Sequence, residues 1–131
     1  MPDYNGVYKL VSSENFDEFL KAMGLNMLMR KAATSGTPTI TVSVSGDHWK
    51  LKQDNKVRSN EMEFDIGVPR EVKTITGKTA TTVVTKQGDT LLERRSGEGK
   101  QPEVVRHFTD SQLTVTMKLD GVTAVRVFQK Q

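Results

Sequence analysis

Two arginines stand in apolar rows of strand-like segments in the last thirty residues of the chain. In Val104–Phe108 and in Val122–Phe128, every second residue is apolar except Arg106 in the first row and Arg126 in the second. A buried arginine keeps its charge, so it needs a carboxylate, a water or another acceptor. If both rows face the interior of a barrel, the two guanidiniums form an anion-binding site. If the strands are flipped, the arginines lie in solvent, because valines make the opposite faces partly apolar too.

The sequence offers little to a catalytic or metal-binding site. It has no cysteine, which excludes a thiolate nucleophile, a disulfide and a cysteine-based zinc site. His48 is expected in a turn, and His107 should point away from Arg106 on the same strand. Scattered serines and carboxylates form no triad and no metal-ligand cluster. We therefore expect a protein that is not an enzyme and that needs no metal and no cofactor.

Length and composition indicate one domain, residues 1–131, able to bury roughly two thirds of its unfolded surface. The chain has no apolar run of membrane-spanning length, and its first residues lack the basic flank and apolar centre of a signal peptide. We expect a soluble, intracellular protein. A secreted lipocalin would fit the Gly6-x-Tyr8 pattern, but the missing signal peptide and cysteines count against it.

The charge balance favours anionic partners only mildly. Nineteen Lys and Arg against 16 Asp and Glu give a formal net charge of +3. Small basic β-barrels do bind single-stranded nucleic acid, which makes this a rival function of another class. Such sites need aromatic stacking platforms, whereas aromatics make up 6% of this chain and fall mostly on inferred inner faces.

Two short helices are predicted early in the chain. Asn15 and Glu18 form a pair of the capping-box kind before an apolar stripe that ends at Gly24. Asn26 caps the second helix. The second helix should bury Leu25, Leu28, Met29 and Ala32 and expose Met27, Arg30, Lys31 and Thr34.

From Thr39 onward the period of the apolar residues is two. With the first strand, Gly6–Val11, about ten strands are predicted, each joined to the next by a hairpin turn. Ten antiparallel strands in a chain of this length predict an all-β fold, an up-and-down barrel whose interior holds one small ligand. The helix pair is then free to cap one mouth of the barrel.

The opening segments Gly6–Leu10 and Glu14–Gly24 resemble the signature of the intracellular lipid-binding proteins, which include the fatty-acid-binding proteins. The resemblance runs from end to end and is nearest to the heart/muscle-type branch. It implies a ten-stranded antiparallel up-and-down β-barrel capped by a helix-turn-helix lid. Further matching positions are Pro38, Gly46, Asp47, Met62, Glu63, Phe64, Gly67, Arg126, Val127 and Phe128.

The resemblance also implies that Arg106 and Arg126 hold the carboxylate of a long-chain fatty acid. Phe128 occupies the position of a tyrosine in the family motif, so one hydroxyl is missing. A hydrogen bond to a charged group contributes about 1.5–3 kcal/mol, so the head group is held less tightly unless a water or another residue substitutes. By alternation with Glu93, Arg95 is a candidate substitute. Alternatively Glu93 neutralises Arg95, or Arg95 lies in solvent.

The tail should set the affinity, because burying a CH₂ contributes about 0.8 kcal/mol. The arginines then select acid over neutral lipid and fix its orientation. Each predicted tail-lining residue could equally belong to the ordinary core. These residues are Phe16, Leu20, Met23, Pro38, Trp49, Leu51, Gln53, Val57, Ile75, Val104, Val115 and Met117.

A basic rim with one exposed methionine is predicted at the mouth of the barrel. Such a rim suits contact with anionic membranes during ligand transfer, since each cation near the surface contributes about 1 kcal/mol. The alternative is a solubilising face. The rim residues are Lys21, Met27, Arg30, Lys31, Lys56 and Arg58.

The sequence thus predicts a monomeric carrier of long-chain fatty acids in the cytoplasm, with delivery to the nucleus left open. Cavity shape is not readable from the sequence, so the nearest alternative is a carrier of a bulkier hydrophobic acid, a retinoid or a bile acid. No nucleic-acid partner is expected.

Overall fold

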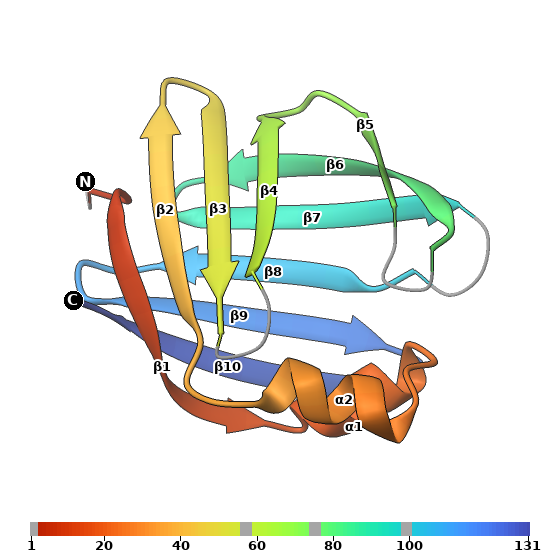
Figure 1. Cartoon of the computed structure of the whole chain (residues 1–131). Helices are drawn as coiled ribbons and strands as arrows, with labels where there is room; N and C mark the ends of the chain where they lie inside the picture. The colour runs from red at the N-terminus through yellow and green to blue at the C-terminus, as the bar shows by residue number, and fades with distance from the viewer. Residues whose placement is uncertain (1–2, 56–58, 74–76, 98–100) are drawn as a thin grey trace.

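Ten antiparallel strands curl into a nearly closed barrel in the computed structural model (Figure 1). The structure describes residues 3–55, 59–73, 77–97 and 101–131. Neighbouring strands are mostly consecutive in the chain, and β1 pairs with β10, as expected of an up-and-down barrel. The strands are β1 Gly6–Glu14, β2 Thr39–Ser45, β3 His48–Asp54, β4 Ser59–Asp65, β5 Arg70–Lys73, β6 Thr79–Gln87, β7 Thr90–Gly97, β8 Glu103–Phe108, β9 Gln112–Leu119 and β10 Val122–Lys130. The predicted fold class is confirmed.

The barrel differs from the prediction between β4 and β5. These strands are the two ends of the sheet order, and no ladder joins them in the described ranges. The connection turns towards β6 instead, where the Gly67 amide donates to the Val84 carbonyl at 2.7 Å. The hairpin expected between these two strands is therefore wrong, and the barrel wall is open at this place.

Strict alternation along the strands builds the interior. On β9, Leu113, Val115, Met117 and Leu119 are all buried, whereas Lys118 between them is exposed. The same period places Phe108 and Phe128 inside, at 1% exposure each. Both of the rows that contain the arginines face inward, which resolves the alternative of flipped strands.

One end of the barrel is filled by aromatic rings. Trp49 lies between Tyr4, at a centroid distance of 5.2 Å, and Phe64, whose ring is stacked at 6.3 Å. The Tyr4 hydroxyl donates to Asp89 at 2.6 Å, which raises the pKa of Tyr4 to about 12 together with burial. These rings close the end of the barrel formed by the β2–β3 and β6–β7 turns.

The two helices lie together at the other end of the barrel, where α1 packs against β10 and β9 (Figure 1). Helix α1 spans Phe16–Ala22 and helix α2 spans Met27–Thr34. Gly24 adopts φ +93° after α1, and the Asn26 side chain accepts a hydrogen bond from the Met29 amide at 2.9 Å, so both predicted signals are confirmed. No helix in the described part of the chain has the length and apolar character needed to cross a membrane.

The capping box predicted at Asn15 is wrong. Asn15 has φ 58° and its side chain makes no capping hydrogen bond. Its Nδ2 donates instead to the Thr123 carbonyl at 3.2 Å. Because β1 continues to Glu14, the chain must reverse within one residue, and Asn tolerates the left-handed conformation that this requires.

The predicted faces of α2 are also partly wrong. Leu28 is 77% exposed rather than buried, whereas Leu25, just before the helix, is buried. Arg30, expected at the exposed rim, folds back over the lid. Its Nε lies 3.1 Å from Asp17 Oδ1, and its Nη1 donates to the Leu25 carbonyl at 2.8 Å. Arg30 therefore ties α2 to α1.

Candidate ligand-binding cavity

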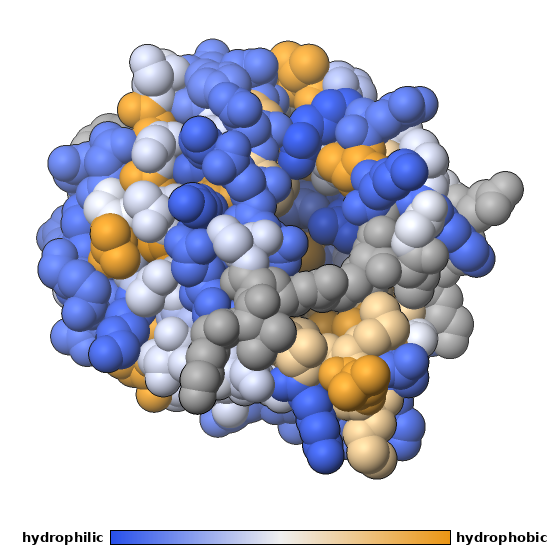
Figure 2. Space-filling view, viewed as in Figure 1, coloured by the Kyte–Doolittle hydropathy of each residue, from blue (hydrophilic) through white to orange (hydrophobic). Residues whose placement is uncertain are grey.

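The barrel encloses a cavity of about 610 Å³, within the usual range of roughly 300–1,000 Å³ for ligand pockets. Figure 2 shows a hollow in the surface, rimmed largely by hydrophilic side chains, where Figure 1 leaves β4 and β5 apart. Residues of both strands line the cavity, among them Met62 of β4 and Arg70 of β5. The gap between β4 and β5 therefore connects the cavity to the surface.

Eight of the predicted tail-lining residues line this cavity. They are Phe16, Leu20, Met23, Leu51, Gln53, Val104, Val115 and Met117. Trp49 and Pro38 are buried but are not among its lining residues, so both fit the alternative of an ordinary core position. Trp49 packs in the aromatic end of the barrel, and the Pro38 carbonyl accepts from the Leu10 amide at 3.1 Å as part of the wall. Val57 and Ile75 lie outside the described residues.

Arg106 and Arg126 lie on either side of one strand, β9. Arg106 of β8 and Arg126 of β10 both pair in register with Val115 of the intervening β9. Their backbones are therefore two strand spacings apart, about 10 Å. Both side chains line the cavity, and Arg126 is 5% exposed. Two long cationic side chains at this spacing can reach one anionic group between them.

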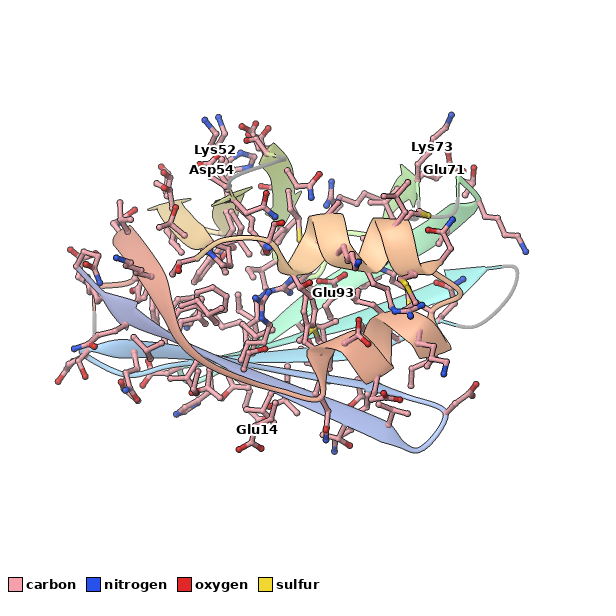
Figure 3. All side chains as sticks on the ribbon, turned by 60° about the horizontal axis from the view of Figure 1, so that its bottom comes forward. Glu14, Lys52, Asp54, Glu71, Lys73 and Glu93 are labelled. Carbon is pink, nitrogen blue, oxygen red and sulfur yellow. The ribbon has the colours of Figure 1, made fainter. Side chains whose placement is uncertain are left out.

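Arg106 already has a carboxylate partner inside the barrel. Glu93 of β7, 1% exposed, accepts from Arg106 Nη1 at 2.7 Å and from Arg95 Nε at 3.0 Å. Figure 3 shows Glu93 within the barrel beneath the helices, whereas the labelled Glu14, Lys52 and Glu71 lie at the periphery. Burial by itself would raise the pKa of Glu93, but the charges and hydrogen bonds of Arg106 and Arg95 outweigh it and hold the pKa below its usual value. Glu93 is thus an anion.

Arg95 faces the cavity and forms an ion pair with Glu93, so the position in solvent is excluded. Its side chain remains 24% exposed. Whether it also contacts a ligand stays a prediction. Alternation predicts that Glu93 and Arg95 share a face, but it does not predict the bond from Glu93 to Arg106, which depends on the register of β7 against β8.

Arg126, unlike Arg106, forms no ion pair with a carboxylate among the described residues. Its Nε is buried and has no hydrogen-bond partner in the described structure. Its guanidinium lies over the Phe16 ring, 4.0 Å from the centroid, and 5.7 Å from that of Phe128. Burial lowers the pKa of Arg126 to about 10, so it remains a cation at neutral pH. Arg126 therefore presents to the cavity a buried positive charge that forms no ion pair with any described residue.

Arg70 and Thr82 are among the lining residues that the sequence pattern did not predict. Arg70 shares the inward face of β5 with Val72, and this alternation over a four-residue strand was the only available signal. Thr82 is 1% exposed on β6, where Ala80 and Val84 mark the same face.

The predicted rim is partly assembled. Lys21, Met27 and Lys31 are exposed on or beside the helices. Arg30 is engaged by Asp17, and its side chain is 16% exposed, so it does not belong to the exposed rim. Lys56 and Arg58 lie outside the described residues.

The histidines lie on the outside of the barrel. His48, expected in a turn, begins β3, and its ring nitrogens lie 2.9 Å from Asp65 and 2.6 Å from Glu63. These contacts raise the pKa of His48, the bond to Glu63 most. His107 lies 2.9 Å from the Thr90 hydroxyl. Neither histidine is among the cavity-lining residues of the described chain.

Comparisons with known proteins agree with this architecture. Residues 5–131 match the model of the lipocalin / cytosolic fatty-acid binding protein family. A fatty acid-binding protein of Tyrophagus putrescentiae is 40% identical over the whole of both chains, and cellular retinoic acid-binding protein 2 of Mus musculus is 35% identical over the whole of both chains. The crystal structure of a fatty acid-binding protein from the brain of Drosophila melanogaster superposes with a TM-score of 0.90 at 33% identity, covering 97% of this chain and 99% of that one. The chain belongs to the lipocalin / cytosolic fatty-acid binding protein family.

Proposed function

We propose that this protein binds and carries long-chain fatty acids, with the carboxylate at Arg126 and the tail in the apolar part of the cavity. The observation that carries the proposal is the buried guanidinium of Arg126, which has an unpartnered Nε, lies over the Phe16 ring and lines a cavity of about 610 Å³. Relatives named as fatty acid-binding proteins, from Tyrophagus putrescentiae and Lepidoglyphus destructor, support the same ligand class.

The tail and the head group of the ligand contribute different amounts to the free energy of binding. A chain of ~15 methylenes offers on the order of 12 kcal/mol before ordering costs, at about 0.8 kcal/mol for each buried CH₂. The carboxylate contributes only a few kcal/mol but removes the cost of an unpaired buried cation at Arg126. Arg106 is less available, because Glu93 holds its Nη1 and Nη2 lies 3.9 Å from the Met62 sulfur. Phe128 supplies no hydroxyl, so Arg126 is the principal contact.

Calorimetry on the delipidated protein tests this assignment with palmitate and with hexadecanol, which has the same chain length and no charge. We expect the wild type to prefer the acid, and Arg126→Leu to weaken palmitate binding by about 1.5–3 kcal/mol while hexadecanol changes little. The matched control is Arg94→Leu, since that arginine is on β7 but 72% exposed. Equal binding of acid and alcohol by the wild type would refute a carboxylate site at Arg126.

A bulkier hydrophobic acid is the second candidate ligand. The relative from Mus musculus, whose printed name is cellular retinoic acid-binding protein 2, favours a retinoid over a bile acid. A carboxylate is common to both ligand classes, so Arg126 would have the same role. Competition of retinoic acid with palmitate distinguishes the two candidates.

We also propose that the protein acts as a monomeric carrier, without catalysis, in the cytosol, and that it delivers ligand to membranes. The exposed Lys21 and Lys31, with Met27 at 63% exposure, supply a basic face with an apolar side chain for contact with anionic lipid. Nucleic acid is a poor partner, because Tyr8, Trp49 and other rings that could stack on bases are packed inside the barrel.

A further inference from the structure

Arg106 and Arg126 form one pair of cavity-lining arginines, and the cavity contains a second pair with the same arrangement on its strands. Arg70 of β5 and Arg95 of β7 both pair in register with Thr82 of the intervening β6. This repeats the relation of Arg106 and Arg126 to Val115, so the second pair also has backbones two strand spacings apart, about 10 Å. All four arginines line the cavity.

Glu93 forms an ion pair with one arginine of each pair. It binds Arg95 from the second pair and Arg106 from the first, at 3.0 and 2.7 Å. Arg70 and Arg126 remain outside this bridge. Each has a buried Nε without a hydrogen-bond partner, and within the described ranges neither forms an ion pair with a carboxylate. Among the described lining residues, Arg70 on β5 and Arg126 on β10 are thus arginines whose Nε lacks a hydrogen-bond acceptor.

The charge of the lining exceeds what one monocarboxylate can neutralise. Among the described lining residues are five cations, the four arginines and Lys73, against two carboxylates, Glu61 and Glu93. Burial lowers the pKa of Arg70, and the neighbouring charge of Arg95 lowers it further, although Glu93 acts in the opposite direction. A fatty acid at Arg126 leaves Arg70 unchanged. Arg70 is half-buried and its buried Nε has no hydrogen-bond partner, so a further anion would supply the missing acceptor.

We propose that Arg70, with Arg95 across Thr82, forms a second carboxylate-binding subsite in the cavity. The second carboxylate comes either from the far end of an α,ω-dicarboxylic acid whose first end is at Arg126, or from a second fatty-acid molecule. Arg70 lies on the strand beside the opening between β4 and β5, through which the cavity meets the surface. The inference rests on the proposed function, because it takes Arg126 as the first carboxylate subsite.

The test is calorimetry of palmitate and of 1,16-hexadecanedioate with the delipidated full chain. The variants are Arg70→Met, Arg70→Lys, Arg126→Leu and the exposed control Arg94→Met, and thermal melts verify that each variant is folded. If one diacid spans both subsites, Arg70→Met weakens hexadecanedioate by about tenfold or more, as expected for loss of a hydrogen bond to a charged group, and leaves palmitate unchanged. Arg70→Lys, which keeps the cation, restores part of the affinity.

If instead two molecules bind, the stoichiometry of palmitate is two in the wild type and one in Arg70→Met. The inference is overturned if palmitate binds once and depends on Arg126, while Arg70→Met changes neither ligand. Failure of the proposed function gives a different result, namely no palmitate binding or binding that is indifferent to Arg126→Leu. A loss at Arg94→Met equal to that at Arg70→Met would also refute the subsite, because it would indicate a general effect of net charge.

Discussion

We expect the substitution Glu93→Gln to lower the stability of the barrel and to raise its affinity for a fatty acid. The change removes the carboxylate that holds Arg106 at 2.7 Å and Arg95 at 3.0 Å, but keeps the volume of the side chain. Removing one partner of a buried ion pair leaves its charge uncompensated and typically costs 3–5 kcal/mol, so we expect a loss of about that size from the free energy of unfolding. Because Arg95 and Arg106 are 24% and 15% exposed, water offsets part of this cost, and the lower end is expected.

Affinity should move in the opposite direction. In the wild type, Glu93 accepts a hydrogen bond from Arg106, so Arg106 is less available to the proposed ligand carboxylate. In Glu93→Gln, Arg106 is free to join Arg126 across Val115, and a hydrogen bond to a charged group contributes about 1.5–3 kcal/mol. We expect palmitate to bind roughly ten- to a hundredfold more tightly, whereas hexadecanol should be unaffected.

Urea unfolding and calorimetry measure the two effects. The control is Glu103→Gln, which removes a half-exposed carboxylate 4.0 Å from Arg94 and should change stability by less than about 1 kcal/mol. The pKa of Glu93 is lowered in the folded state, so its contribution is complete above its ordinary value near 4.5 and is lost as the pH falls further through the folded pKa. The stability of wild type and variant should therefore converge in acid. Unchanged stability and unchanged palmitate affinity at pH 7 would refute the role assigned to Glu93.

Two other outcomes follow from the charges described above. Because burial lowers the pKa of Arg126 to about 10, palmitate affinity should fall as the pH rises through that value, and hexadecanol affinity should not; equal profiles for the two ligands in calorimetry would contradict a cationic contact. The double variant Lys21→Glu/Lys31→Glu should transfer a fluorescent fatty acid about tenfold or more slowly to acidic vesicles, since each cation near an anionic surface contributes about 1 kcal/mol. Transfer to neutral vesicles is its control, and an unchanged rate to acidic ones would contradict membrane contact.

The two-residue periodicity of the strands predicted most of the fold, and it predicted which residues share a face with Arg106 and Arg126. Alternation predicted that Arg106 shares a face with Phe108 and Arg126 with Phe128, because every second residue of a strand shares a face, and the family resemblance favoured the inward orientation that the structure has. The bond from Glu93 to Arg106 could not be predicted in this way. It joins residues on neighbouring strands that are diagonal in register, and register between strands is set by turns whose lengths the sequence leaves open.

Local signals failed where tertiary structure overruled them. Asn15 and Glu18 have the spacing of a capping box, but the preceding strand continues to Glu14 and forces Asn15 into a left-handed conformation. Leu28 has the helical spacing of a core residue but projects from a lid that covers the barrel with only part of its surface. Arg70 was missed because its strand of four residues is too short to display a period.

The packing of Trp49 determines which optical signal reports on which event. It is the only tryptophan in the sequence, is 1% exposed, and has its ring stacked 7° from the plane of Phe64 in the aromatic end of the barrel. The cavity-lining residues do not include it. Its emission should therefore shift when water reaches the indole on unfolding and respond little to a fatty acid. Tryptophan fluorescence thus reports on the folding of this protein. Ligand binding has to be measured by calorimetry or with a fluorescent lipid.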